Sequence, residues 1–341
     1  MGIKKLTVGV TSYNLESYIE RALDSILAQK TNFSFDILVV DDASTDKSLQ
    51  ILESYQQKYP DTIKVIVSPQ NYGNLHTLNT IFAYIKTPYF LLIDGDDYLL
   101  DSNCLQKEAD FLDAHPDFTL CGGNTVRMRN GKLAERVIPS CKTRLVYTID
   151  DYFNETCPYI HTSALMVRNV VYKNGVPEEY IKGEATSDTL VYRGDTMRFL
   201  HHLQYGKLFI FPDTFSVYRI RSGSIWQGSS DFSRLLKLSF FNLRCTALFP
   251  EQKDFFTRLF FWNYQKLLNC LCRSCCQKDV LNATDRKYFD ELLDLIACHN
   301  LDDSGFKRAT SVVYKCWIKA KAYGRILMRQ VQRIVKDKSG Y

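Results

Sequence analysis

The stretch Tyr89-Phe-Leu-Leu-Ile-Asp94-Gly-Asp-Asp97 decides the fold expected for this sequence. A short apolar run of this kind predicts a buried β-strand, and the acidic residues behind it mark the strand's carboxyl end. An earlier apolar run, Phe35–Val40, ends in the same way with Asp41 and Asp42. The chain therefore places two acidic clusters at the carboxyl ends of two expected strands.

Strand and helix patterns alternate around these two acidic endings. Strands are expected at Leu6–Thr11, Phe35–Val40, Lys64–Val67 and Tyr89–Ile93, and helices at Leu15–Gln29, Ser44–Tyr59 and Leu75–Ile85. Strands separated by helices imply βαβ crossovers and a mostly parallel, Rossmann-like sheet flanked by helices, which is an α/β fold. Ligands of such open sheets bind beyond the carboxyl ends of the strands, so both acidic endings should face one crevice.

The pattern changes twice further along the chain. From about Leu120 to Trp226 it is mixed; strands are expected at Ser163–Val167 and Thr214–Arg219, with a helix at Thr196–Gln204. Beyond this region the helical spacings dominate, at Phe232–Phe249, Asp254–Cys276, Asp285–His299 and Ser311–Lys336. We therefore expect an α/β domain over residues 1–227 and a C-terminal helical region over residues 228–341.

The last helical pattern is basic on one face. Between Lys315 and Lys338 the chain has eight basic residues and one acidic residue, with Trp317 near the boundary of the apolar face. A basic amphipathic helix of this kind is typical of docking on an anionic membrane surface. A surface helix packed on its own domain is the alternative.

Composition limits the classes of protein. A net charge of +5, with 45% hydrophobic and 24% charged residues, is that of an ordinary globular chain and too mild to indicate nucleic-acid binding. An odd count of 11 cysteines and a start without a secretory signal favour a reducing cytosol. No apolar run is long enough to span a membrane. The expected location is the cytoplasm, peripheral on the inner face of the cytoplasmic membrane.

The two acidic clusters each allow a structural and a functional interpretation. Carboxylates crowded as in Asp94–Asp97 repel one another unless a cation lies among them, and hard oxygen ligands suit Mg²⁺ or Mn²⁺. An acidic turn without a ligand is the alternative. The segment Asp41–Asp46 also has two interpretations. In the structural one, Ser44 or Thr45 caps the next helix. In the functional one, a carboxylate accepts hydrogen bonds from a nucleotide base or ribose.

Four motifs in order carry a family resemblance. They are Thr11-Ser-Tyr-Asn14, Val40-Asp-Asp-Ala-Ser-Thr-Asp46, Asn71-Tyr-Gly-Asn-Leu-His-Thr-Leu-Asn79 and Asp94-Gly-Asp-Asp97. This set resembles the family 2 inverting glycosyltransferases of GT-A fold over roughly residues 5–226. The resemblance implies that residues 1–100 bind a nucleotide-sugar and that residues 101–227 face the acceptor.

The resemblance also implies roles for individual residues. Thr11, Tyr13, Asp41 and Asp42 would form the nucleotide pocket. Asp94 and Asp96, supported by Asp97, would hold a divalent ion at the donor diphosphate, so Asp94 also counts among the nucleotide-binding residues. His76, in the third motif, is a candidate diphosphate contact, with an ordinary surface histidine as the alternative.

The closing segment of the resemblance is Tyr218–Trp226. Where the family often has a histidine that reaches the metal, this chain has Arg221, which cannot bind a cation but can pair with a diphosphate. Trp226 would cover the sugar or pack on the helical region. His161 would face the acceptor, with a hydrogen-bonded structural histidine as the alternative.

The catalytic base is expected in the step Gly194-Asp195 at the start of a helix. An inverting transfer needs one carboxylate to deprotonate the acceptor hydroxyl, and the family carries it in such a step. Asp195 is the candidate, a plain helix cap is the alternative, and Asp188 is the reserve.

The expected activity is metal-dependent inverting transfer of a sugar, with a UDP-sugar as donor, to a hydroxyl of a glycan or lipid-linked glycan. Bacterial capsule, lipopolysaccharide or another surface polysaccharide is the setting that the family implies. Two alternatives remain: an inactive membrane-associated partner subunit with the same fold, and a sugar-nucleotide pyrophosphorylase. The aromatic-rich helices between Phe232 and Trp262 leave room for a homo-oligomer.

Overall fold

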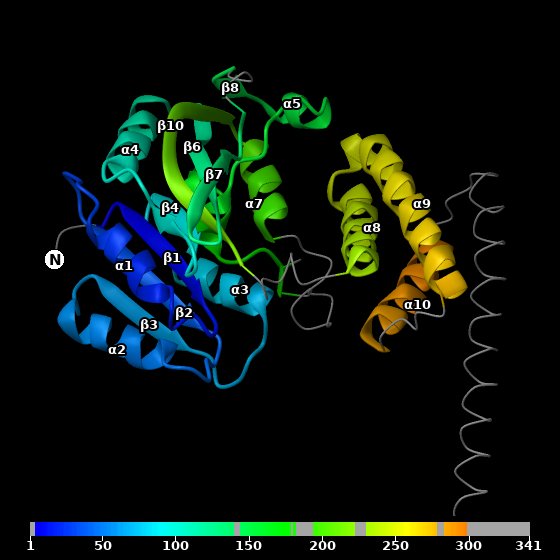
Figure 1. Cartoon of the computed structure of the whole chain (residues 1–341). Helices are drawn as coiled ribbons and strands as arrows, with labels where there is room; N and C mark the ends of the chain where they lie inside the picture. Colours follow the sequence, from blue (N-terminus) through cyan, green and yellow to red (C-terminus); the bar gives the residue numbers. More distant parts are fainter. Residues whose placement is uncertain are drawn as a thin grey trace, which may run out of the picture. The chain divides into compact units, whose positions relative to one another are not determined.

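The computed structural model describes residues 4–139, 144–178, 180–181, 194–221, 230–277 and 283–298. The chain divides into two compact units, Met1–Gly228 and Ser229–Tyr341. Figure 1 shows that the first unit combines a sheet with helices and that the labelled elements of the second unit are all helices.

The first part of the first unit alternates strands and helices. Its elements are β1 (Leu6–Ser12), α1 (Ile19–Leu27), β2 (Phe35–Asp41), α2 (Ser48–Lys58), β3 (Ile63–Val67), α3 (Asn74–Tyr84) and β4 (Tyr89–Asp94). All four predicted strands and all three predicted helices of this part are confirmed. The later elements are β5 (Tyr98–Leu99), α4 (Cys104–Ala114), β6 (Phe118–Arg129), β7 (Lys132–Arg136), β8 (Val146–Tyr147), α5 (Ile149–Phe153), η1 (Thr162–Ala164), β9 (Leu165–Arg168), η2 (Tyr172–Asn174), α7 (Gly194–Leu203) and β10 (Lys207–Ile220).

The described strands join one sheet of mixed direction. Its order is β3-β2-β1-β4-β9-β6-β10-β5, with β7 paired to β6 and β8 to β10. The strands from β3 to β4 are parallel, β9 runs antiparallel to both of its neighbours, and β6 and β10 are parallel again. The sheet is therefore the mostly parallel α/β sheet that the sequence predicts, with one reversed strand in its middle.

Helices cover both faces of β1. Val8 and Val10 are fully buried in the core that contains Ile19 and Leu23 of α1. Gly9 points to the other face, where an added Cβ atom would lie 2.6 Å from Ile81 of α3. Each buried aliphatic side chain contributes about 1.5–3 kcal/mol, so this double cover fixes the position of β1 and hence of its carboxyl end.

Two predicted helix starts are wrong by four residues. The pattern predicted α1 from Leu15 and α2 from Ser44, but the helices begin at Ile19 and Ser48. The Ser44 hydroxyl donates to Asp41 Oδ1 instead of capping α2, and Lys47, at the cap position, makes no side-chain cap hydrogen bond. The Ser44 hydroxyl is thus used at the end of β2 and not at the start of the helix.

All described elements of the second unit are helices. It contains α8 (Asp231–Leu248), η4 (Pro250–Gln252), α9 (Lys253–Gln277) and α10 (Ala283–Cys298), close to the three predicted helices. Phe240, Phe256 and Phe260 are almost fully buried inside the unit, whereas Trp262 is 58% exposed. Most aromatic side chains that suggested a homo-oligomer are thus used in the unit's own core, and the oligomer stays a prediction.

The basic helix predicted at Ser311–Lys336 lies outside the described residues. Within the described ranges, no helix combines the length and the apolar character that crossing a bilayer requires.

Gly95 allows the acidic turn after β4 to lie directly on β1. Its N–H donates to Thr11 O at 2.9 Å, and an added Cβ atom would lie 2.7 Å from that same carbonyl oxygen. A backbone carbonyl in a central strand cannot move aside as a side chain can. Only glycine therefore permits this contact between the turn and the strand.

We expect Gly95→Ala to lower the free energy of unfolding by about 3 kcal/mol, at the upper end of overpacking costs. Gly131→Ala is the control: Gly131 has φ +77° in the β6–β7 hairpin, with nothing within 4 Å of an added Cβ atom. That variant should lose only about 1 kcal/mol, from the left-handed backbone. Urea unfolding of both measures the difference, and a Gly95→Ala loss no larger than the control's would contradict the close contact.

Candidate active site

Three strand ends meet at one edge of the sheet in the first unit. In the ladder, Ser12 of β1 lies opposite Asp41 of β2, and Thr11 of β1 lies opposite Asp94 of β4. The Ser12 hydroxyl donates to Asp41 Oδ1 at 3.0 Å, and the Thr11 hydroxyl donates to Asp94 Oδ1 at 2.9 Å. The two acidic endings therefore flank the end of β1, as the sequence predicts.

Asp41 is fully buried and holds its own loop together. Oδ1 accepts hydrogen bonds from the hydroxyls of Ser12 and Ser44, and Oδ2 accepts one from Ser44 N at 2.8 Å. The Ser44 hydroxyl oxygen in turn accepts from Asn14 N at 2.9 Å. Asp41 thus ties the loop after β1 to the loop after β2.

Asp42 organises the segment that precedes α3. Its Oδ1 accepts a hydrogen bond from Tyr72 N at 3.0 Å, and its Oδ2 accepts one from Gly73 N at 2.7 Å. His76, in the first turn of α3, stacks on the Tyr72 ring with 4.4 Å between centroids. Tyr72 is 42% exposed and Tyr13 is 44% exposed, so aromatic surface is available on the loops after β1 and β3.

The turn after β4 concentrates negative charge. Burial and, to a smaller extent, the nearby charge of Asp96 raise the pKa of Asp94 to about 6. Burial and the charges of Asp96 and Asp94 raise the pKa of Asp97 well above its usual range. These shifts are the response expected of carboxylates that are crowded without enough positive charge among them.

The end of β10 supplies part of the missing positive charge. Arg221 Nε donates to Asp96 Oδ2 at 2.6 Å. Arg219 donates from its backbone N–H to Asp97 Oδ1 at 2.8 Å and from Nε to Asp96 O at 2.9 Å. Both guanidinium groups also lie over the ring of Tyr18. The strand predicted at Thr214–Arg219 is longer than expected, and its end is fastened to the acidic turn.

The donor set fits a divalent cation without forming a complete coordination shell. Asp94 and Asp96 are only partly buried and carry hard oxygen ligands, which suit Mg²⁺ or Mn²⁺. In contrast, Asp97 Oδ1 is used by Arg219, and Asp97 Oδ2 is buried without a hydrogen-bond partner. Over the described part of the chain, no three His, Cys, Asp or Glu side chains are arranged to hold a metal ion.

His161 lies beneath this turn, at 6% exposure. Its Nδ1 is 2.8 Å from Ser163 Oγ and 3.7 Å from Asp97 Oδ2, and its ring stacks on Tyr218. Burial lowers the pKa of His161 to about 4, so the ring is neutral at pH 7. This is the hydrogen-bonded histidine that the sequence left as the alternative to an acceptor contact.

Asp195 lies in the first turn of α7, as predicted. Its Oδ1 accepts a hydrogen bond from Thr196 N at 2.8 Å. The Asp195 charge acts to raise the pKa values of both Asp94 and His161, so the start of α7 lies within electrostatic range of the acidic turn. The reserve candidate Asp188 and the predicted sugar cover Trp226 lie outside the described residues.

Sequence reasoning missed two arginines at this site. Arg219 fastens the acidic turn, and Arg198, on α7, acts to lower the pKa of Asp94. The spacing of Arg198, three residues after Asp195, was the available signal, because residues three apart share one face of a helix.

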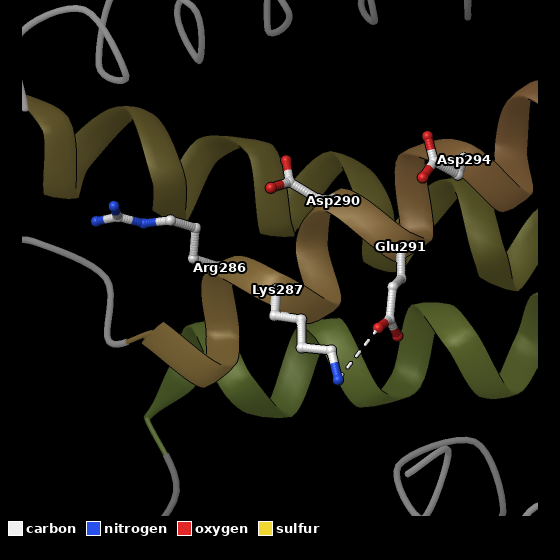
Figure 2. Close-up of a pocket in the computed structure, with 5 residues that line it drawn as sticks. All are labelled: Arg286, Lys287, Asp290, Glu291 and Asp294. Carbon is white, nitrogen blue, oxygen red and sulfur yellow. Dashed lines mark ion pairs between the residues drawn. The ribbon is translucent and has the colours of Figure 1, made fainter. Parts of the chain in front are cut away.

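A separate depression lies on α10 in the second unit (Figure 2). It has a volume of about 490 Å³ and is lined by Arg286, Lys287, Asp290, Glu291 and Asp294. Its lining comes from a single helix and includes the Lys287–Glu291 pair at 3.7 Å, which is an ordinary surface arrangement. None of the predicted site residues lines it.

Comparison with known proteins agrees with this geometry. Residues 7–175 match the family model described as Glycosyl transferase family 2. The chain carries a family 2 glycosyltransferase domain. The match includes the ends of β1, β2 and β4, while α7 and the end of β10 lie beyond it.

Relatives with curated descriptions share parts of the chain. Rv1520 of Mycobacterium tuberculosis, described as uncharacterised, is 28% identical over 218 residues, which is 64% of this chain and 59% of that protein. Poly(ribitol-phosphate) beta-N-acetylglucosaminyltransferase TarS of Staphylococcus aureus is 30% identical over 188 residues, 53% of this chain and 31% of TarS. The chain thus spans less than two thirds of either relative.

Solved structures share the fold. TarS residues 1–349 of S. aureus in complex with UDP-GlcNAc gives a TM-score of 0.57 at 19% identity, covering 86% of this chain and 80% of that one. Mannosyltransferase PcManGT from Pyrobaculum calidifontis, in complex with GDP-Man and Mn²⁺, gives 0.51 at 17% identity, with 89% of each chain covered. The family 2 domain therefore has the GT-A-like sheet that the motifs imply.

The neutral, buried His161 makes stability depend on pH. The unfolded histidine takes up a proton near pH 6.5, whereas the folded one resists protonation until about pH 4. The contribution is therefore present above about pH 6.5 and is lost as the pH falls toward 4, by up to about 1.4 kcal/mol per pH unit.

Urea unfolding between about pH 7 and pH 5 tests this, with His161→Gln as the comparison. The difference in unfolding free energy between the two proteins should shrink as the pH falls, because only the wild type must exclude the proton. A difference that stays constant would show that His161 titrates normally in the folded protein.

Proposed function

We propose that this chain transfers a sugar from a nucleotide-sugar, expected to be a UDP-sugar, to an acceptor hydroxyl with inversion and with the help of Mn²⁺ or Mg²⁺. The observation that carries the proposal is the meeting of β1, β2 and β4, which brings the loop of Asp41 and Asp42 beside the acidic turn at Asp94. The S. aureus TarS structures with UDP and UDP-GlcNAc support a uridine nucleotide.

The nucleotide would lie on the loops after β1 and β2. The hydrogen bonds of Asp41 with Ser12 and Ser44 hold these loops in place before any ligand arrives. Asp42 fixes Tyr72 through its backbone, and the exposed rings of Tyr13 and Tyr72 offer apolar faces for a base. Most of this pocket is therefore preorganised, which lowers the entropy cost of binding.

The donor diphosphate would lie at the turn after β4. Asp94 and Asp96 would hold the divalent ion, which screens the charge that develops on the departing diphosphate. The Thr11 hydroxyl keeps Asp94 in one orientation, and Asp97 holds the backbone of Arg219. Arg221 sits on Asp96 and can pair with a phosphate oxygen when the carboxylate takes a different partner.

Asp195 would act as the general base. As the acceptor oxygen attacks the anomeric carbon, its proton passes to the Asp195 carboxylate, and the bond from that carbon to the diphosphate oxygen breaks. The electron pair of the broken bond stays on the diphosphate, and attack from the opposite face inverts the anomeric carbon. Among the described residues, Asp195 makes hydrogen bonds only with Thr196, so its carboxylate remains available for a substrate.

The acceptor would be a hydroxyl of a bacterial surface glycan or another cell-envelope polymer, lipid-linked or free. TarS is named for poly(ribitol-phosphate), and a 97-residue match at 38% identity is to a teichoic acid poly(glycerol phosphate) polymerase of Staphylococcus epidermidis. Docking of the basic segment Lys315–Lys338 on the inner face of the membrane, which would bring the enzyme to such an acceptor, stays a prediction.

We expect Asp195→Asn to bind UDP like the wild type and to lose about 10²–10⁴-fold in transfer or donor hydrolysis, the usual range for a general base. Asp150→Asn is the matched control, because Asp150 is an exposed aspartate in the first turn of α5. Calorimetry with UDP and turnover of a UDP-sugar panel measure both effects. Near-normal turnover would remove Asp195 from this role and direct attention to Asp188.

We expect Asp96→Asn to weaken UDP binding about tenfold or more in the presence of Mn²⁺ and to leave binding in EDTA nearly unchanged, because one metal ligand is lost. Asp110→Asn, which changes an exposed carboxylate on α4, is the control. Titration calorimetry with and without Mn²⁺ compares the three proteins. Equal losses with and without the metal would mean that Asp96 acts through Arg221 and not through a cation.

A further inference from the structure

Arg198 carries a buried positive charge that the proposed mechanism leaves unused. It lies on α7, one turn after Asp195, and is only 2% exposed. Its Nη2 donates a hydrogen bond to Thr162 Oγ1 at 3.1 Å. No carboxylate in the described ranges forms an ion pair with it.

Four other arginines of this unit have polar partners. Arg221 pairs with Asp96, and both Arg127 and Arg129 pair with Glu135. Arg168 donates to the backbone carbonyls of Phe118, Leu112 and His115. Within the described residues, Arg198 has neither a carboxylate in an ion pair nor a backbone carbonyl as a hydrogen-bond acceptor.

An unpaired guanidinium is costly to bury. It cannot lose its proton at any physiological pH, so it cannot become neutral as a buried lysine or carboxyl group can. In the part of the chain that the structure describes, the Arg198 side chain has one hydrogen bond, to a hydroxyl, and no carboxylate close enough for an ion pair. Proteins keep such strain mainly at places where a ligand supplies the missing partner.

The surroundings of Arg198 show where that ligand would lie. Thr162 belongs to η1, which packs against β4, the strand that ends at Asp94. Thr162 directly follows His161, whose Nδ1 lies 3.7 Å from Asp97 Oδ2 in the acidic turn. Asp94 in this turn and Asp195, one helical turn before Arg198, are both partly exposed.

We propose that Arg198 binds a phosphate oxyanion of the substrates beside the acidic turn, an inference that rests on the proposed glycosyl transfer. A guanidinium fork matches two phosphate oxygens, which a neutral sugar hydroxyl cannot neutralise. Two groups share this chemistry: the diphosphate of the donor and a phosphate carried by the acceptor. In either case Arg198 holds the substrate pair between Asp94 and Asp195.

The test compares the full chain as wild type, Arg198→Gln and Arg198→Lys, with Arg129→Gln as the control that removes an exposed guanidinium. Calorimetry in EDTA measures the affinities for UDP and uridine, and for glycerol 3-phosphate in the presence of UDP. If the anion is the donor's, Arg198→Gln should bind UDP about tenfold more weakly and uridine unchanged. If the anion is the acceptor's, Arg198→Gln should show the same loss of affinity for glycerol 3-phosphate, and its affinity for UDP should be unchanged.

The lysine variant and the thermal midpoint distinguish phosphate binding by Arg198 from a purely structural role. Arg198→Lys keeps the charge without the fork and should retain part of the lost affinity. Whatever its midpoint without ligand, Arg198→Gln should gain less thermal stabilisation from UDP or glycerol 3-phosphate than the wild type gains.

Two results would overturn the inference. If the wild type binds UDP and both phosphate probes bind Arg198→Gln within about twofold of the wild type, Arg198 binds no phosphate and the proposed function still stands. If the wild type binds neither UDP nor glycerol 3-phosphate, the inference and the proposed function both fail.

Discussion

Repulsion among the carboxylates that follow β4 is the constraint on which the rest of this site depends. Asp94, Asp96 and Asp97 lie within four residues, and their mutual repulsion adds to desolvation in raising the pKa values of Asp94 and Asp97. Guanidinium groups from distant segments of the chain supply positive charge near these carboxylates. Arg219 on β10 and Arg221 just after it lie more than 120 residues further along the chain, and Arg198 lies on α7.

These arginines relieve the repulsion only in part, and the remainder has a functional meaning. Arg221 neutralises Asp96, but Asp97 keeps one buried oxygen without a partner, and Arg198 keeps a charge without a carboxylate. A divalent cation with a diphosphate would complete both sets of interactions at once, since it supplies positive charge to the acids and negative charge to Arg198. Under the proposed function, the protein without ligand is arranged for a charged substrate and not for maximum stability.

The acids of β2 play a different part from those of β4. Asp41 and Asp42 are almost fully buried and use their oxygens to hold the loops after β1 and β3. Asn14 and Ala43, in the loops after β1 and β2, have φ values of 53° and 59°, a region that costs energy for residues with a Cβ atom. The hydrogen bonds of Ser44 and Asp41 stabilise these conformations, so the nucleotide side of the site is rigid before binding.

The sequence predicted the parts of the fold that local patterns encode. The first four strands are short apolar runs with polar endings, and those endings were recognised as one edge of a sheet. The helix start at Ser44 was wrong because the Ser44 hydroxyl donates to Asp41 at the end of β2. The start at Leu15 was wrong because Leu15 lies in a turn whose carbonyl accepts from Tyr18 N, ahead of α1. The strand β6 was missed because it is buried on both faces, so apolar and polar residues do not alternate along it. Gly122, Asn124 and Thr125 also interrupt its apolar run.

The site was predictable to a similar extent. The acidic residues of the two strand ends could be selected because each lies directly behind an apolar run. Asp195 was selected only through the family resemblance, and its role as a base stays a prediction. Arg198 and Arg219 could not be assigned partners from the sequence, because their contacts depend on how α7 and β10 pack against β4. Whether the acids bind a metal is likewise a property of the assembled site and not of any one segment.

Crystals of the full chain soaked with UDP and Mn²⁺, measured for the anomalous signal of manganese, test the central claim most directly. The account predicts an anomalous peak between the diphosphate and the carboxylates of Asp94 and Asp96, with Arg221 turned from Asp96 toward a phosphate oxygen. Nucleotide bound elsewhere, or bound at this edge with no manganese peak and with Arg221 still on Asp96, would contradict it.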